Sequence, residues 1–81
     1  MRIDKFLKNS RLIKRRPIAK QACDSGRISI NGKTAKAGDE VKIGDKIEIR
    51  FGEKLIKAEI LSIPNVTTKE NASNMYRIIT L

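Results

Sequence analysis

The chain has 81 residues, a formal net charge of +9, and a composition that is 40% hydrophobic and 33% charged. This composition indicates one small domain over residues 1–81 and excludes a disordered tail, and the absence of a long apolar run argues against a membrane partner. One cysteine and no histidine exclude an internal disulfide and a Cys/His metal site, so we expect a cytoplasmic protein without cofactor or metal.

Positive charge is concentrated between Arg2 and Arg27, which carry +7 of the net charge because only Asp4 and Asp24 oppose the cations there. Charge runs are usually solvated surfaces, but this density with so few acids favours contact with a polyanion, and we expect nucleic acid. The candidate contacts are Arg2, Lys5, Lys8, Arg11, Lys14, Arg15, Arg16, Lys20 and Arg27.

A first helix is predicted over residues 3 to 9. Ile3, Phe6 and Leu7 share one arc of a helical wheel, and Lys5 lies on the other side. Asp4 falls in the first turn, where the positive end of the helix dipole favours a carboxylate. We therefore expect Asp4 to organise the basic face, through the dipole or an arginine partner, and not to act as an acid catalyst.

A second helix is predicted to begin near Arg16, because Pro17 is tolerated in a first helical turn, and to end at Gly26. Cys23 is expected in the core, because the chain has no histidine to activate it as a nucleophile. The apolar face of this helix is expected to contain Ile18, Ala19, Ala22 and Cys23.

Two arginines at the start of this second helix break a local rule. The guanidinium groups of Arg15 and Arg16 meet the positive helix end unfavourably, at a cost of roughly up to 1 kcal/mol. A bound phosphate would reverse the sign of this interaction and also use the free backbone donors of the first turn. A broken rule at the most charged point of the chain indicates a functional site.

After residue 27 the sequence predicts an antiparallel sheet. Asn31-Gly32 favours a type I′ turn, which can present Asn31 and Lys33 beside the helices as further nucleic-acid contacts. Alternation predicts a half-buried strand with one face formed by Ile47, Ile49 and Phe51. More strands are expected over 55–63 and 75–81, and between them 64–74 is polar, mobile or ordered by a partner, with a helical turn near 68–72. The fold class is therefore α+β, with two short N-terminal helices packed on a small antiparallel sheet.

Four groups of residues in one order carry a family resemblance: Arg2-x-Asp4-Lys5-Phe6-Leu7, Arg16-x-x-Ala19, Gly26-Arg27-Ile28-x-Ile30-Asn31-Gly32 and Gly44-Asp45-x-Ile47. Together they resemble the S4-type RNA-binding domain over about residues 2 to 51. The resemblance implies an S4-like, αL-type RNA-binding fold whose helices bind structured RNA. Arg15 departs from the pattern, because the family commonly has a Ser or Thr helix cap there.

The stretch KFLKNSRLIKRRPIAKQACDSGRISING, with the later ENASNMY run, is similar to the RqcP (YabO) family of small bacterial S4-type factors. This resemblance implies a ribosome-associated quality-control factor on stalled large ribosomal subunits that carry peptidyl-tRNA, acting while alanine tails are added. The implied partners are 23S rRNA of the large subunit, tRNA and RqcH, and the protein is expected to be a monomer off the ribosome. Arg2, Asp4 and Arg16 match motif positions important to that family.

Two alternatives remain open. One is an S4-type factor that recycles stalled subunits, as a small heat-shock protein of the same S4 type does, and that has no role in tailing. The other is a helix-turn-helix DNA-binding regulator, which would need a dimer and a recognition helix that offers side chains to base edges. For contact with base edges, the second helix offers only Lys20 and Gln21 at its middle, which weakens this alternative. An enzyme such as a pseudouridine synthase is not expected, because its catalytic domain is absent.

Overall fold

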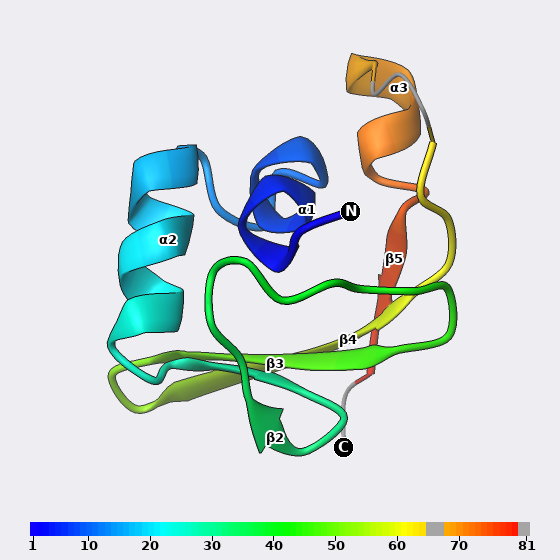
Figure 1. Cartoon of the computed structure of the whole chain (residues 1–81). Helices are drawn as coiled ribbons and strands as arrows, with labels where there is room; N and C mark the ends of the chain where they lie inside the picture. The colour runs from blue at the N-terminus through cyan, green and yellow to red at the C-terminus, as the bar shows by residue number, and fades with distance from the viewer. Residues whose placement is uncertain (65–67, 80–81) are drawn as a thin grey trace.

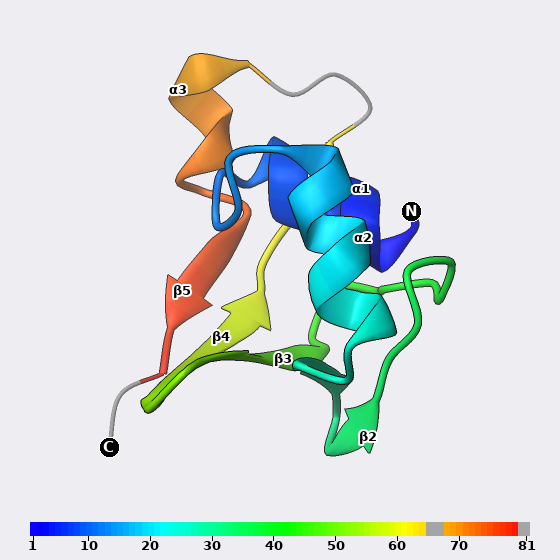
Figure 2. The ribbon, with the colours of Figure 1, turned by 90° about the vertical axis from the view of Figure 1, so that its left-hand side faces the viewer.

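The computed structural model describes residues 1–64 and 68–79. In chain order its elements are α1 (Ile3–Asn9), α2 (Arg16–Asp24), β1 (Ile28–Ile30), β2 (Lys33–Thr34), β3 (Lys46–Phe51), β4 (Lys54–Ile60), α3 (Lys69–Ala72) and β5 (Tyr76–Ile78). The strands form one antiparallel sheet in the order β2-β1-β3-β4-β5. Helices α1 and α2 lie side by side on one face of it, and α3 stands beside α1 above β5 (Figures 1 and 2). This architecture confirms the predicted α+β class.

The core lies between the two N-terminal helices and the sheet. Helix α1 contributes the fully buried Ile3, Phe6 and Leu7, as its predicted apolar arc requires, and the sheet contributes Ile28, Ile47, Ile49 and Ile60. Ser10 is also buried, and its hydroxyl donates a hydrogen bond to the carbonyl oxygen of Leu7 at 3.2 Å. Burying these apolar side chains fixes α1 on the sheet and holds its polar face outward.

Three local signals in the sequence are confirmed by the backbone. Helix α2 begins at Arg16, with Pro17 in its first turn. At its other end Gly26 has φ +77°, and the amide of Arg27 donates to Ala22 O at 3.0 Å, which together close a Schellman motif. Asn31 and Gly32 both have positive φ, as the predicted type I′ turn between β1 and β2 requires.

The strands predicted over 55–63 and 75–81 are shorter within the described residues. Strand β4 stops at Ile60, well before the expected end at 63, because the amides of Leu61 and Ser62 both donate to the carbonyl of Met75 and so interrupt the regular ladder. Strand β5 spans only Tyr76–Ile78 of the expected 75–81, and residues 80–81 lie outside the described residues. The helical turn expected near 68–72 is confirmed as α3, whereas residues 65–67 of the predicted mobile segment also lie outside them.

Two apolar side chains are more exposed than the sequence patterns predict. Ile18 is 48% exposed, because α2 packs on the core through the small side chains of Ala19, Ala22 and Cys23, and Ile18 falls at the edge of that face. Phe51 is exposed because it ends β3 at the tip of the β3–β4 hairpin, while Ile47 and Ile49 on the same face are buried.

Candidate nucleic-acid interface

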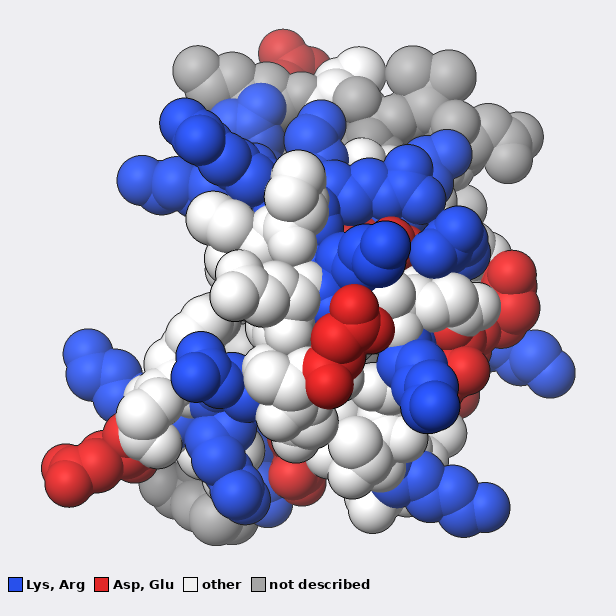
Figure 3. Space-filling view, turned by 60° about the vertical axis from the view of Figure 1, so that its left-hand side comes forward, with Lys and Arg blue, Asp and Glu red and all other residues white. Residues whose placement is uncertain are grey.

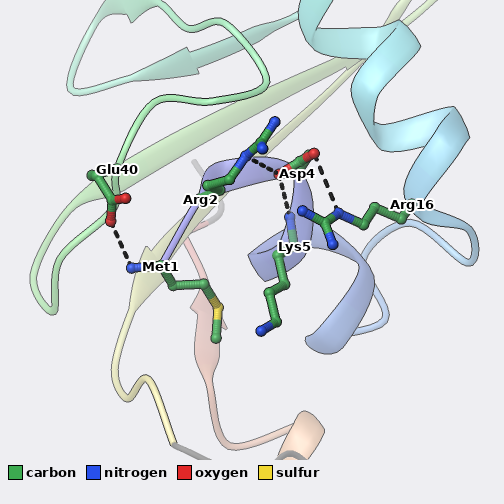
Figure 4. A network of polar contacts seen from close by, with 6 residues as sticks. All are labelled: Met1, Arg2, Asp4, Lys5, Arg16 and Glu40. Atoms are coloured by element: carbon green, nitrogen blue, oxygen red, sulfur yellow. Dashed lines mark hydrogen bonds and ion pairs between the residues drawn. The ribbon is translucent and has the colours of Figure 1, made fainter.

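A buried carboxylate joins the two N-terminal helices. Asp4 is only 2% exposed, and its two carboxylate oxygens lie 3.3 Å from the Nε atoms of Arg2 and Arg16. Figure 4 shows the two arginines reaching Asp4 from the chain start and from α2, while the backbone amide of Lys5 donates to Asp4 Oδ1 at 2.8 Å. Both arginine side chains remain about half exposed, so one buried acid positions two cations at the surface.

The chain start is held beside this cluster. The N-terminal ammonium group of Met1 lies 2.7 Å from Glu40 Oε2, and the amide of Val41 donates to Met1 O at 2.9 Å. Arg2 and Glu40 form an isolated antiparallel bridge. Because these contacts fix the backbone on the N-terminal side of α1, they also limit where the Arg2 side chain can lie.

The start of α2 lacks its own compensation for the helix dipole. Arg15 occupies the N-cap position in an extended conformation without a side-chain cap hydrogen bond, and the first turn contains no acid. The carboxylate that approaches this helix start comes instead from Asp4 of α1, through Arg16. The unfavourable placement of arginines at this positive helix end is thus present in the structure, as the sequence predicts.

All eight lysines and arginines of the first 20 residues are exposed at the surface. Figure 3 shows Lys and Arg atoms gathered across the upper half of the view, over α1 and the beginning of α2, with fewer acids there than in the lower half. Within this surface, a shallow depression of about 340 Å³ is lined by Arg2, Asp4, Arg16, Pro17 and Lys20. The exposed cations of the surface, which we name the helical basic face, are Arg2, Lys5, Lys8, Arg11, Lys14, Arg15, Arg16 and Lys20.

Comparison with known proteins places this geometry in a family. Residues 1–47 match the S4 domain family. The RQC P-site tRNA stabilizing factor of Bacillus subtilis is 56% identical over 79 residues, covering 98% of this chain and 92% of that protein. The protein of the same name from Streptococcus pneumoniae is 51% identical, with coverages of 98% and 90%. The chain belongs to the S4-domain family of RQC P-site tRNA stabilizing factors.

Solved structures of other S4-like proteins have the same fold. The trimeric structure of heat shock protein 15 from Vibrio cholerae matches with a TM-score of 0.87 at 30% identity, covering 98% of this chain and 81% of that one. The solution structure of the hypothetical protein HP1423 matches with a TM-score of 0.84 at 36% identity, covering 100% and 99%. The S4-like fold predicted from the spaced motifs is therefore confirmed.

Not all of the predicted contact residues of this S4-family chain lie together. Arg27 is exposed at the far end of α2, where it lines a small polar hollow on the sheet with Arg50. Lys33 and Asn31 lie at the β1–β2 turn, on the side of the molecule away from the start of α2 (Figure 1). The Asn31 amide nitrogen donates to Asp45 Oδ1 at 3.0 Å, and its oxygen accepts from the Lys46 amide at 2.9 Å. Asn31 thus joins two turns, and its contact with RNA stays a prediction.

Sequence reasoning missed two polar residues that the structure brings to the cations. Asn9 and Thr68 line a pocket together with Lys8, Arg11 and Lys14. The signal for Thr68 was its position three residues before Asn71, since the two side chains form a capping box at α3. The proximity of Thr68 to α1 depends on tertiary packing, which a local sequence pattern does not predict.

The one cysteine of this S4-family chain lies where the sequence predicts it. Cys23 is buried in the core, and burial, with smaller effects from Asp4, Asp24 and Asp39, raises the pKa of its thiol to about 11. A thiol with that pKa is protonated at neutral pH and is a poor nucleophile. Among the described residues there is no cluster of three potential metal-ligating side chains, and no helix long and apolar enough to cross a membrane.

Proposed function

We propose that this protein is an RNA-binding factor of bacterial ribosome-associated quality control. It binds stalled large ribosomal subunits through 23S rRNA and peptidyl-tRNA, and it supports RqcH while alanine is added to the blocked nascent chain. It catalyses no reaction of its own and acts in the cytoplasm. Support comes from the name of its relatives, which at 51–56% identity are tRNA stabilizing factors of the P site, and from the surface described above.

The observation that carries this proposal is the Asp4-centred pair of arginines. Asp4 is buried and holds Arg2 and Arg16, whose side chains are about half exposed. Burying its charge costs desolvation free energy, so the ion pairs contribute little net stability. What Asp4 provides is a fixed placement of two guanidinium groups beside the other cations of the helical basic face. Guanidinium groups bind phosphate oxygens in a bidentate geometry, so fixed arginines favour a particular backbone path over any diffuse polyanion.

The mechanism follows from what this surface can recognise. A-form RNA presents its phosphates and ribose hydroxyls more readily than its base edges, and proteins recognise it largely by shape. The helical basic face is rich in Lys and Arg, and the whole chain has only three aromatic residues to stack on bases. Binding one rRNA element and one tRNA element at the same time would hold the tRNA in place for the partner that performs the chemistry.

One alternative retains an observation in its favour. The fold also matches heat shock protein 15 of Vibrio cholerae, and a heat shock protein 15 homolog from Haemophilus influenzae is 39% identical over 64 residues. A recycling factor of that kind would bind large subunits without changing alanine tailing. Deleting the gene and measuring alanine tails on a stalled reporter separates the two, because only the proposed function predicts their loss. The S4 match favours RNA binding over the helix-turn-helix alternative.

The proposed interface is tested by the salt dependence of binding to purified large subunits. If five to seven cations neutralise phosphates, log K falls with log salt with a slope of roughly −4 to −6. Arg2→Ala should weaken association and make the slope shallower by about 1. Lys54→Ala, at the distant β3–β4 hairpin, is the matched control with the same loss of charge, and it should leave both quantities unchanged. A slope near zero would overturn the proposal.

A further inference from the structure

A second basic pocket lies apart from the Asp4 cluster. It measures about 460 Å³, within the range of pockets that hold small ligands, and its described lining residues are Lys8, Asn9, Arg11, Lys14 and Thr68. None of these residues lines the depression around Arg2 and Arg16. The two hollows therefore offer separate places for an anion on one small protein.

The backbone conformation at Arg11 is unfavourable for an arginine. Arg11 has φ +65° and follows the C-cap residue Ser10 of α1, with its amide donating to Lys8 O at 3.0 Å. This left-handed position after a helix favours glycine, and an arginine there carries conformational strain. The corresponding position after α2 is occupied by Gly26, with φ +77°. One chain thus uses glycine at one helix end and arginine at the other, and the arginine lines a pocket with Lys8 and Lys14.

The composition of the pocket selects its ligand. Lys8, Arg11 and Lys14 supply three cations, and the described lining residues include no acid and no aromatic ring. Asn9 and Thr68 add an amide and a hydroxyl, which can bond to phosphate or ribose oxygens. Charge of one sign without a stacking surface suits the phosphodiester backbone of RNA and not an unstacked base.

Thr68 gives the pocket a wall that lies outside the matched S4 region, residues 1–47. Its orientation at the start of α3 is fixed, because its amide donates to Asn71 Oδ1 at 2.7 Å and its hydroxyl oxygen accepts from the Asn71 amide at 3.2 Å. The segment that carries α3 therefore contributes to the basic surface as well as following β4. A pocket built from both parts has a defined shape that the helices alone would not provide.

We propose that this pocket is a second RNA-backbone subsite, in which Arg11, Lys8 and Lys14 hold a phosphate while the Arg2–Arg16 arginines hold another RNA segment. The inference rests on the proposed function, since it assumes that the ligand is RNA of the large subunit or its tRNA. It adds that the strained Arg11 and the Thr68 wall belong to the interface. The protein then contacts RNA at two points, one near the beginning of α1 and one near its end.

The first test replaces Arg11 by glycine, the residue that its backbone conformation favours. Arg11→Gly should retain or raise the melting temperature, because it relieves the left-handed strain, yet it should weaken association with purified large subunits about tenfold and make the salt slope shallower by about 1. Combined with Arg16→Ala, its effect should be additive, as expected for independent subsites. If Arg11→Gly binds as tightly as the native chain while Arg16→Ala does not, the subsite is refuted and the proposed function stands. If neither variant loses affinity, both fail.

The second test uses two substitutions that differ only in charge. Asp and Asn are both good helix N-caps, so Thr68→Asp and Thr68→Asn should each preserve α3. In the pocket, however, the carboxylate of Thr68→Asp would repel a phosphate. We expect Thr68→Asp to bind large subunits several-fold more weakly than Thr68→Asn at low salt, with the difference shrinking as salt is raised. Equal affinities at low salt would overturn the subsite.

Discussion

The Oδ2 atom of Asp4 lies 3.3 Å from the Nε atom of Arg16, and this contact connects the first turn of α1 to the first residue of α2. The carboxylate is buried, whereas the arginine side chain is 46% exposed. The buried carboxylate therefore restricts the orientation of a cation at the surface. Removing the Asp4 carboxylate should change the orientation of the Arg16 guanidinium group more than it changes the stability of the fold.

Substitutions at Asp4 distinguish orientation from bulk charge. Asp4→Asn preserves the shape and the oxygen that accepts from the Lys5 amide, so it should cost about 1 kcal/mol or less in association with large subunits. Asp4→Arg places a cation between Arg2 and Arg16 and should abolish function, although it raises the net charge. Asp24 is an exposed acid on α2, and Asp24→Arg is therefore the control with the same change of charge. Tighter, functional binding by Asp4→Arg in co-sedimentation would mean that charge alone matters.

Binding and folding should separate at two positions. Arg16→Ala should weaken association by about 1–3 kcal/mol, because a charge-assisted phosphate contact is lost. The free energy of unfolding should change by less than about 1 kcal/mol, since Arg2 still pairs with Asp4. Ile47→Ala, in the core, should instead reduce stability by about 2–4 kcal/mol. Urea unfolding and co-sedimentation measure both quantities, and an unfolded Arg16→Ala protein would contradict this separation.

The raised pKa of Cys23 predicts a loss of stability at alkaline pH. Burial, and then the charge of Asp4, Asp24 and Asp39, raises the pKa of the thiol from 9.0 to about 11 in the folded protein. The unfolded chain ionises first, so this contribution is fully present below about pH 9 and is lost as pH rises toward 11, to a total of about 2–3 kcal/mol.

The control for this titration is Cys23→Ala, which cannot ionise. Lysine deprotonation affects both proteins alike, so the difference between their pH dependences isolates the thiol. Urea unfolding at pH 8 and at pH 10.5 should show a steeper decline for the native chain than for Cys23→Ala. Parallel declines would show that Cys23 titrates normally in the fold.

The hydrogen bonds of the β1–β2 turn should contribute more to stability than the charge of that turn does. Asn31→Gly keeps a residue that tolerates positive φ but removes the hydrogen bonds to Asp45 and to the Lys46 amide, so it should cost about 1–2 kcal/mol of folding free energy. The neighbouring Lys33→Ala removes an exposed charge and should leave the melting temperature unchanged. A stable Asn31→Gly protein in thermal unfolding would show that the link between the two turns is dispensable.

Local sequence signals predicted most of the fold. Pro17, Gly26 and Asn31-Gly32 each restrict the backbone by their own chemistry, so a helix start, a helix end and a turn could be placed without knowing any tertiary contact. The end of β4 could not be placed in this way, because it depends on Met75, whose carbonyl accepts from Leu61 and Ser62. The exposure of Ile18 likewise depends on how closely α2 approaches the core.

The sequence proposed the residues of the candidate site but not their arrangement. The charge density marked the cations, and the first-turn position marked Asp4, but the sequence left open whether Arg2 or Arg16 would be its partner. The structure uses both. The pocket between Arg11 and Thr68 joins residues far apart in the chain, and a capping box predicts a helix without indicating its neighbour.

The sheet ends on each side in a very short strand, and this has a consequence for association between copies. β2 has two residues and β5 has three, with Lys33 exposed on one and Arg77 paired with Glu59 at 2.6 Å on the other. Long, flat edges attract strands from other molecules, whereas short edges with charged side chains offer few backbone partners. Bound RNA would neutralise the repulsion that a charge of +9 provides. The short edges should still resist amyloid-like stacking when that repulsion is gone.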